Sequence, residues 1–223
     1  MNIAENILKH SLQNVYFLSG PAMAGKTTMS KALSEKHGFI HFNDNWHEDS
    51  FKVWLSICDE KYQKKSAKRN ALTNEEFFGR SVEEFLAAGD YNGYDEYLEF
   101  AIIELIKLSQ HSKVVADVDV PMELLLQISD YNRIACMLVS PELVNCHTYG
   151  SREDHREFLE CLLSLPESDK KIAVQDELFR IGIERKFEEA RKHSLFSIVR
   201  TKDSTVEGTL RLLERHFGLE DAP

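Results

Sequence analysis

The sequence lacks several features that would place it in other classes of protein. No apolar run approaches the roughly 20 residues that a membrane-spanning helix needs. The start, Met-Asn-Ile-Ala-Glu-Asn, lacks the charged-then-apolar plan of a secretory signal. The four cysteines include no C-x-x-C pair, so a zinc site has no support. We therefore expect a cytoplasmic protein with free thiols and no membrane partner.

Positive charge is also scarce. The chain carries 27 Lys and Arg against 37 Asp and Glu, a formal net charge of −10. Binding to nucleic acid requires phosphates to be neutralised by Lys and Arg, so we expect no nucleic-acid partner. No long Pro/Gly linker divides the 223 residues, and 43% of them are hydrophobic, which argues against disorder. We expect a single domain over 1–223, whose oligomeric state the sequence leaves open.

The most informative stretch follows the apolar run 15–18, which predicts a buried strand, and precedes a predicted helix. It reads Gly20-Pro21-Ala22-Met23-Ala24-Gly25-Lys26-Thr27-Thr28. Glycine, four residues and then Gly-Lys-Thr, between a strand and a helix, is the pattern of a P-loop. We predict a phosphate cradle formed by Gly20, Ala22, Met23, Ala24, Gly25, Lys26, Thr27 and Thr28.

Each part of this pattern has a physical reason. Gly20 and Gly25 let the backbone fold tightly around an oxygen-rich ligand, with the loop N–H groups and the positive helix end pointing at phosphate. Lys26 supplies a compact charge for the β- and γ-phosphates. The hydroxyl of Thr27 is a ligand for Mg²⁺, because a hard cation prefers oxygen. ATP and Mg²⁺ are therefore the expected cofactors.

Five predicted strands alternate with helices along the chain. They cover about 15–19, 39–42, 113–119, 134–139 and 195–199. This alternation is typical of a parallel α/β sheet with helices on both faces. Two long helical insertions, 47–112 and 147–193, follow strands two and four, at the carboxyl edge where ligands bind. Capping boxes at Thr73 and Ser204 predict further helix starts.

With the P-loop and this layout, the chain resembles the P-loop small-molecule kinases. These include nucleoside monophosphate kinases, shikimate and gluconate kinases and chloramphenicol phosphotransferase. The resemblance implies the sheet order 2-3-1-4-5, an acceptor-binding insertion at 47–112 and an arginine-carrying lid at 147–193. It also implies that the loop after strand five packs on the adenine, with Arg200 stacking on the base. Many members carry glycine at the position of Met23.

Three carboxylates are candidates for the chemistry. Asp117 ends an apolar strand and is expected to hold Mg²⁺ through water; Asp119 lies on the same side of that strand and would face the acceptor. The alternative is that one of them caps the helix that begins near Pro121. Asp44, just after strand two, is placed to accept the proton of an attacking hydroxyl, or else it belongs to a turn or helix cap.

Phosphoryl transfer also needs a positive charge on the transferring group. Arg152 and Arg156, four residues apart at the start of the predicted lid, would share a helix face and serve as catalytic residues with Lys26. The alternative for each arginine is a surface salt bridge. The nine histidines show no ligand spacing, so none, His41 included, is assigned to metal or catalysis.

The predicted activity is an ATP- and Mg²⁺-dependent phosphotransferase that moves the γ-phosphoryl group to a hydroxyl or phosphate of a small molecule. Nucleoside monophosphate kinases hold a second phosphate with several arginines, but residues 42–112 contain only two arginines, Arg69 and Arg80. This small number favours a neutral hydroxyl acceptor over a monophosphate. The alternative function is a nucleotide-dependent ATPase switch that acts on a protein partner. The short chain and the two insertions favour the kinase.

Overall fold

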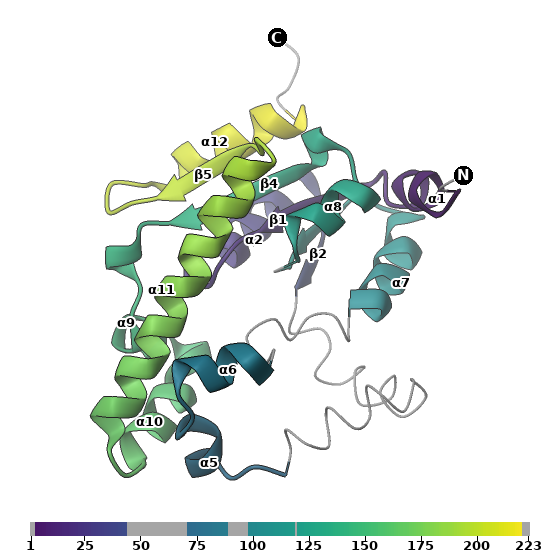
Figure 1. Ribbon diagram of the computed structural model, residues 1–223. Coiled ribbons are helices and arrows are strands. Elements are labelled where there is room, and N and C mark those ends of the chain that lie inside the picture. The colour runs from purple at the N-terminus through teal and green to yellow at the C-terminus, as the bar shows by residue number, and fades with distance from the viewer. Residues whose placement is uncertain (1–2, 44–70, 89–97, 119, 220–223) are drawn as a thin grey trace. The chain divides into compact units, whose positions relative to one another are not determined.

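The computed structural model describes residues 3–43, 71–88, 98–118 and 120–219, which fall into two compact units (Figure 1). Unit 1 comprises Met1–Trp46, Leu98–Ser140 and Ile183–Pro223. Unit 2 comprises His47–Tyr97 and Pro141–Gly182. Each unit is therefore assembled from segments that are far apart in the sequence.

Unit 1 is built on a sheet of five strands, and each strand runs parallel to its neighbours. The strands are β1 (Val15–Ser19), β2 (Ile40–Asn43), β3 (Val114–Asp117), β4 (Ile134–Val139) and β5 (Ser197–Arg200). Their order is β2-β3-β1-β4-β5, so the predicted fold class and strand order are confirmed. β1, β3 and β4 are buried along their whole length, as continuous apolar strands covered on both faces are.

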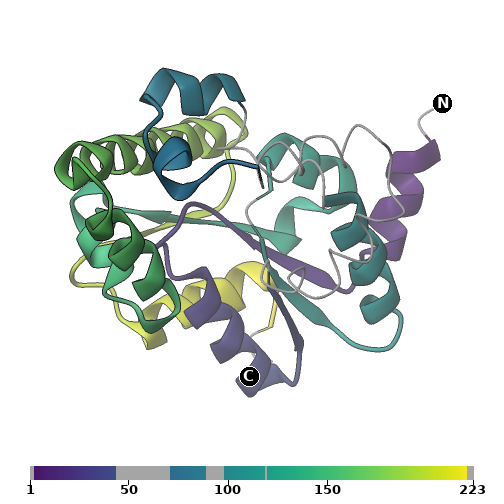
Figure 2. The ribbon, with the colours of Figure 1, turned by 90° about the horizontal axis from the view of Figure 1, so that it is seen from below.

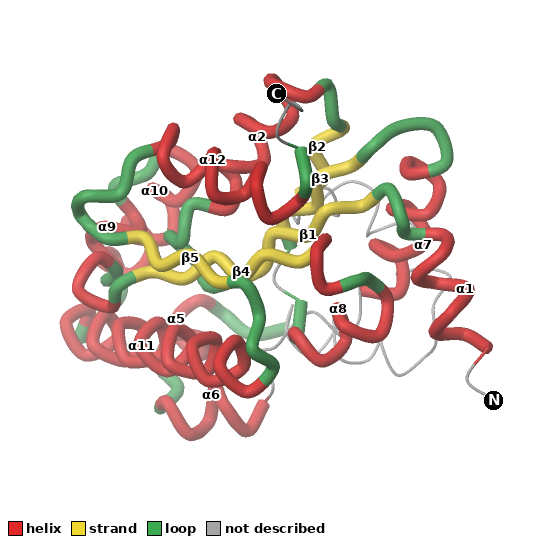
Figure 3. Tube along the Cα trace, turned by 90° about the horizontal axis from the view of Figure 1, so that it is seen from above, coloured by secondary structure: helices red, strands yellow, loops and turns green. Residues whose placement is uncertain are grey.

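Helices cover both faces of this sheet. They are α1 (Ile3–Ser11), α2 (Lys26–His37), α7 (Leu98–Ser109), α8 (Met122–Ile128), the end of α11 (Ser168–Lys192) and α12 (Val206–Phe217), with the 3₁₀ turn η3 (Tyr131–Arg133). Figure 3 shows α2 and α12 together on one face and α8, with α1 against it, on the other. Gly38 and Gly218 end α2 and α12 in the left-handed conformation that favours glycine.

Unit 2 is helical and has a core of its own. It contains α5 (Asn74–Phe78), α6 (Val82–Ala88), η4 (Pro141–Leu143), α9 (Cys146–Gly150), η5 (Glu153–His155), α10 (Arg156–Ser164) and α11 as far as Gly182. Buried Cys146, Leu162 and Ile172 form the centre. Partly buried Phe78, Phe158, Leu159 and Phe179 pack around them. Residues from both predicted insertions therefore share one apolar cluster.

The helix starts show how local hydrogen bonds decide the boundaries. The capping box at Thr73 is confirmed: its hydroxyl accepts from the Glu76 amide at 3.2 Å, and the Glu76 carboxylate accepts from the Thr73 amide at 2.8 Å. The box predicted at Ser204 is wrong by one residue, because the Ser204 hydroxyl accepts from the Thr201 amide instead. Thr205 is the residue that caps α12.

The start of β5 also differs from the prediction. The apolar run from Leu195 predicts a strand from that residue, but β5 begins at Ser197. The Leu195 amide donates to the carbonyl oxygen of Ala190 at 3.0 Å and so helps to end α11. The first residues of the run therefore serve the helix end before the chain enters the sheet.

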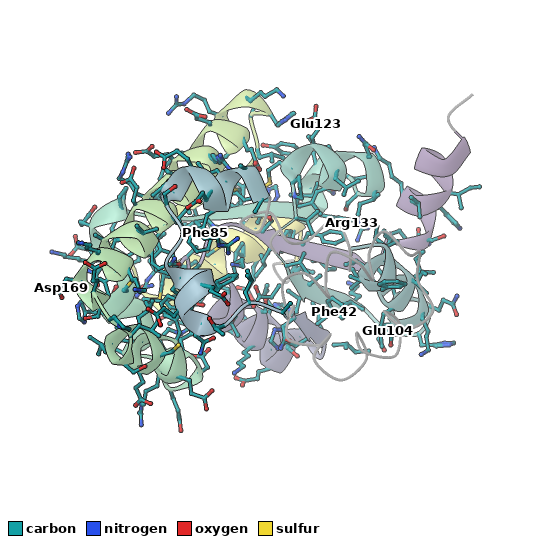
Figure 4. The ribbon with its side chains drawn as sticks, turned by 60° about the horizontal axis from the view of Figure 1, so that its bottom comes forward. Phe42, Phe85, Glu104, Glu123, Arg133 and Asp169 are labelled. Carbon is teal, nitrogen blue, oxygen red and sulfur yellow. The ribbon has the colours of Figure 1, made fainter. Side chains whose placement is uncertain are left out.

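The exterior is consistent with the acidic composition. Glu123 on α8 and Asp169 on α11 are exposed and point away from the ribbon (Figure 4). Within the described part of the chain, no helix is both long enough and apolar enough to cross a bilayer. Cys146 and Cys161, both of unit 2, are free thiols.

Candidate functional site

Two glycines shape the loop between β1 and α2 (Figure 2). Gly20 has a φ of +148°, and a Cβ at this position would lie 1.8 Å from the carbonyl oxygen of Met137 on β4. No larger residue fits without moving β4. Gly25 has a φ of +91° and is the residue that precedes α2. The chain thus turns from strand to helix within a few residues, which leaves the unpaired N–H groups of the first helical turn at the loop.

Lys26 lies across this loop. Its ammonium donates to the carbonyl oxygens of Gly20 at 2.8 Å and Pro21 at 3.1 Å. An ammonium has three donors and no acceptor, so these two carbonyls satisfy most of its hydrogen-bonding capacity. Phosphate oxygens are stronger partners because the bond is charge-assisted on both sides. The charge of Lys26 is therefore held where an anion in the loop would meet it.

The other predicted cradle residues form the rest of the loop and the first turn of α2. Ala22 and Met23 are half-buried, Ala24 is buried, and Thr28 is exposed on α2. Met23 has a φ of +64°, a left-handed conformation that is uncommon for a residue with a side chain. Their roles in nucleotide binding stay predictions.

Thr27 and Asp117 are 90 residues apart in the sequence and in direct contact. The Thr27 hydroxyl donates to Oδ2 of Asp117 at 2.6 Å. The sheet brings them together, because β3 lies beside β1 with Asp117 in register with Leu18. This register places the Asp117 carboxylate beside the first turn of α2, and its role as a ligand of Mg²⁺ stays a prediction.

The pair has the chemistry of a magnesium site. Asp117 is 1% exposed, and its Oδ1 is buried without a hydrogen-bond partner. An unsatisfied carboxylate oxygen is costly to bury, and Mg²⁺ prefers hard oxygen ligands. Thr27 and Asp117 therefore fit the ion that the resemblance implies. No cluster of three or more His, Cys, Asp or Glu side chains suited to a metal occurs among the described residues.

The turn after β3 is held from two sides. The carbonyl oxygen of Val120 accepts from the Ser19 hydroxyl at 3.0 Å and from the Lys186 ammonium at 3.4 Å. Glu189, one turn along α11, pairs with Lys186 at 3.2 Å and accepts from the Met122 amide at 3.5 Å. These bonds hold Val120 and the start of α8.

The two remaining acidic candidates, Asp44 and Asp119, lie outside the described residues, so their catalytic roles stay predictions. Sequence reasoning passed over Lys186, whose side chain is only 12% exposed. No local pattern marks it, since it stands in a charged helix and its contact with Val120 spans 66 residues. The position of the Lys186 ammonium beside Val120 becomes visible only in the folded chain.

His41 is a second residue whose environment the sequence did not reveal. It lies on β2, in register with Val115 and two residues before the partner of Asp117. Burial lowers the pKa of the imidazole, the charge of Asp117 acts to raise it, and Lys31 lowers it further. Its Nε2 is buried without a hydrogen-bond partner. A neutral imidazole therefore stands near the buried carboxylate.

Arg200, the last residue of β5, reaches the P-loop. Its guanidinium donates to the carbonyl oxygen of Met23. Its Cδ would lie 3.9 Å from a Cβ placed on Gly25, so the stem of the side chain passes over the end of the loop. The predicted stacking of Arg200 on a base stays a prediction, but the residue is in contact with the predicted nucleotide site.

Arg152 and Arg156 are in unit 2. They do not share one helix: Arg152 is extended and precedes η5, whereas Arg156 is the exposed first residue of α10. Arg152 donates from Nε to Asp154 at 3.0 Å and also forms an ion pair with it. Burial acts to raise the pKa of the Asp154 carboxyl, but the bonds from Arg152 and the charges of His155 and Arg152 outweigh it and lower the pKa. The catalytic role of both arginines stays a prediction.

No family model matches the chain, and no curated protein does. Among solved structures, a shikimate kinase from Bacteroides thetaiotaomicron is 17% identical with a TM-score of 0.43, over 92% of this chain and 98% of that one. A shikimate kinase from Acinetobacter baumannii in complex with shikimate is 15% identical with a TM-score of 0.42, over 93% and 95% of the two chains. These values carry no conclusion about activity. The chain's own strand order, β2-β3-β1-β4-β5 with the glycine-shaped loop between β1 and α2, is the order that the resemblance to the P-loop small-molecule kinases implied.

Proposed function

We propose that this protein is a phosphotransferase that uses ATP and Mg²⁺ and moves the γ-phosphoryl group to a hydroxyl of a small molecule. The observation that carries the proposal is the contact between Thr27 and Asp117 beside the glycine-shaped loop. It joins a hydroxyl at the helix start to a buried carboxylate with one unsatisfied oxygen. That combination suits a magnesium ion next to a bound phosphate.

Each residue of the loop has a defined task in this proposal. The loop amides and the start of α2 bind the phosphates, and Lys26 exchanges its bonds to Gly20 and Pro21 for phosphate oxygens. Thr27 and Asp117 would hold Mg²⁺. Bound there, the ion would supply positive charge beside the transferring phosphoryl group. Catalysis then depends on positioning and charge, because phosphoryl transfer asks for little covalent chemistry from the protein.

The acceptor hydroxyl needs a carboxylate nearby to orient it and to take its proton. Asp44 and Asp119 are the two candidates, since they follow β2 and β3, the two strands that lie on one side of β1 in the sheet. Asp44→Asn should leave ATP affinity intact and reduce turnover by about a hundredfold. The measurement is steady-state turnover with a saturating acceptor. An unchanged turnover would remove Asp44 from the site and leave Asp119 as the candidate.

The activity itself is tested in two steps. Calorimetry with Mg-ATP should show binding at micromolar to millimolar concentrations, and Lys26→Met should weaken it, whereas Lys31→Met, an exposed lysine of the same helix, should not. ATP consumption is then followed with a panel of sugars, nucleosides, antibiotics and nucleoside monophosphates. Slow ATP consumption without an acceptor, and a large rise in ATP consumption with one compound of the panel, would support the kinase activity. No binding of Mg-ATP at millimolar concentration would disprove the proposal.

A further inference from the structure

The P-loop of this chain contains a conformation that its sequence does not favour. Met23 adopts a φ of +64°. A side chain at such a position crowds the following carbonyl group, which is why glycine, or less often asparagine, is usual there. The cradle therefore depends on a strained residue at its centre, and something must hold Met23 in this conformation.

Arg200 provides that support. Its guanidinium donates to the carbonyl oxygen of Met23, and its stem passes over Gly25 at the other end of the loop. Its own backbone is fixed, because β5 pairs with β4 and the Arg200 carbonyl accepts from the Ser140 amide at 2.9 Å. The support thus comes from the sheet, not from the loop.

The bond has a direct effect on the next residue. A trans peptide group is planar, so the carbonyl of Met23 and the N–H of Ala24 point in opposite directions. A carbonyl held toward Arg200 turns the Ala24 amide away from it. In a phosphate cradle the amide hydrogens must face the ligand. Holding the Met23 carbonyl on the side of Arg200 therefore holds the Ala24 N–H on the opposite side of the peptide.

We propose that Arg200 is a positioning residue that holds the Met23 carbonyl and so presents the Ala24 amide to the phosphates of the nucleotide, in place of the glycine that would adopt this conformation unaided. The inference rests on the proposed function, because it requires the loop to bind a triphosphate. It differs from the base-stacking role predicted for Arg200. A positioning role concerns every ligand that contains phosphate, with or without a base.

The experiment compares Mg-ATP with inorganic tripolyphosphate, which has the phosphates but no base. Calorimetry on the full chain measures both affinities for wild type, Arg200→Met, Arg200→Lys and the matched control Arg211→Met, an exposed arginine on α12. We expect Arg200→Met to weaken both ligands by the same factor, about tenfold. Arg200→Lys, which keeps one donor, should recover part of the loss, and Arg211→Met should bind as wild type does.

A second substitution tests the link to Met23. In a Met23→Gly background the left-handed conformation is no longer strained, so Arg200→Met should weaken both ligands by less than about threefold. Melting temperatures of all variants separate a folding defect from a loop defect, and Arg200→Lys provides the readout if Arg200→Met does not fold. Weaker ATP binding with unchanged tripolyphosphate binding would assign Arg200 to the base and overturn the proposal. Unchanged affinity for both ligands would overturn it as well. Wild-type protein that binds neither ligand would instead disprove the proposed function.

Discussion

The loop of unit 1 and the apolar core of unit 2 differ in how far apart their residues lie in the sequence. In unit 1 the cradle is built from consecutive residues, and its shape follows from two glycines and the first turn of a helix. In unit 2 the apolar core joins Phe78 to residues of α9, α10 and α11 that come about 70 or more positions later. The glycine-shaped loop can therefore be predicted from nine consecutive residues, whereas the helical unit cannot be predicted from any short stretch.

The difference also concerns the kind of atom that acts. The cradle presents main-chain groups, whose directions are fixed by backbone angles. The arginines of unit 2 present flexible side chains, and Arg152 is engaged by Asp154 two residues away. A local motif can specify the first kind of site but not the second.

Lys26→Met should produce the largest effect, because it removes the charge held in the cradle without changing the backbone. We expect turnover to fall about a thousandfold. The melting temperature should stay close to that of wild type, since the hydrogen bonds of Lys26 to Gly20 and Pro21 lie within its own loop. Lys31→Met is the control. Turnover within threefold of wild type would contradict the assigned role of the loop.

Leu162→Ala should destabilise unit 2 by about 3 kcal/mol, because Leu162 is completely buried in its core. The matched control is the neighbouring Leu163, which is 52% exposed and whose replacement by alanine should cost little. Urea unfolding followed by circular dichroism measures both. Equal stability of the two variants would show that the cluster around Cys146 does not hold the helices together.

Arg156→Ala tests whether a side chain of unit 2 takes part in catalysis. An arginine that acts on the transferring phosphoryl group should affect turnover, by about tenfold or more, while the affinity for ATP changes less than twofold. Arg180→Ala, an exposed arginine paired with Glu177 on α11, is the control. Weaker ATP binding with unchanged turnover would reject the predicted lid role.

The smallest effect is expected at an ion pair between α2 and α12. Glu214, 4% exposed, contacts Lys36 at 2.6 Å and His37 at 2.7 Å. Burial acts to raise its pKa, but the bonds from Lys36 and His37 outweigh burial and hold the pKa below its usual 4.5. A depressed pKa stabilises the fold above pH 4.5, and this contribution is lost as the pH falls through the folded-state pKa.

Glu214→Gln should therefore lower the stability of unit 1 at pH 7 by about 1 kcal/mol and reduce its loss of stability below pH 4.5. Thermal unfolding at pH 7 and pH 4 measures both effects. The control is Glu207→Gln, an exposed residue of the same helix. A variant with the pH dependence of wild type would show that Glu214 is not the group that titrates.

The sequence predicted the parts of the structure that depend on local physics. The loop from Gly20 to Thr28, the strands β1 and β4 and the helix start at Thr73 follow from short-range patterns that the structure confirms. The strand order came from the resemblance, and the register of β1 with β3 then brought Asp117 to Thr27.

Other features could not be predicted, because they depend on contacts that only the assembled chain contains. The residue that caps α12 is Thr205 and not the predicted Ser204, whose hydroxyl accepts from the Thr201 amide. Lys186 reaches Val120 across 66 residues, and Arg200 reaches Met23 across 177. Arg152 and Arg156 have helical spacing, but the extended backbone of Arg152 separates them.

The contact between Thr27 and Asp117 forms late during synthesis of the chain on the ribosome. The 90 residues between them take a ribosome about 5–18 s to synthesise at roughly 5–20 residues per second. Throughout that interval the nascent loop lacks the strands on either side of β1, and it lacks Arg200 for longer still. The earliest part of the chain to be translated is thus among the last to reach its finished form.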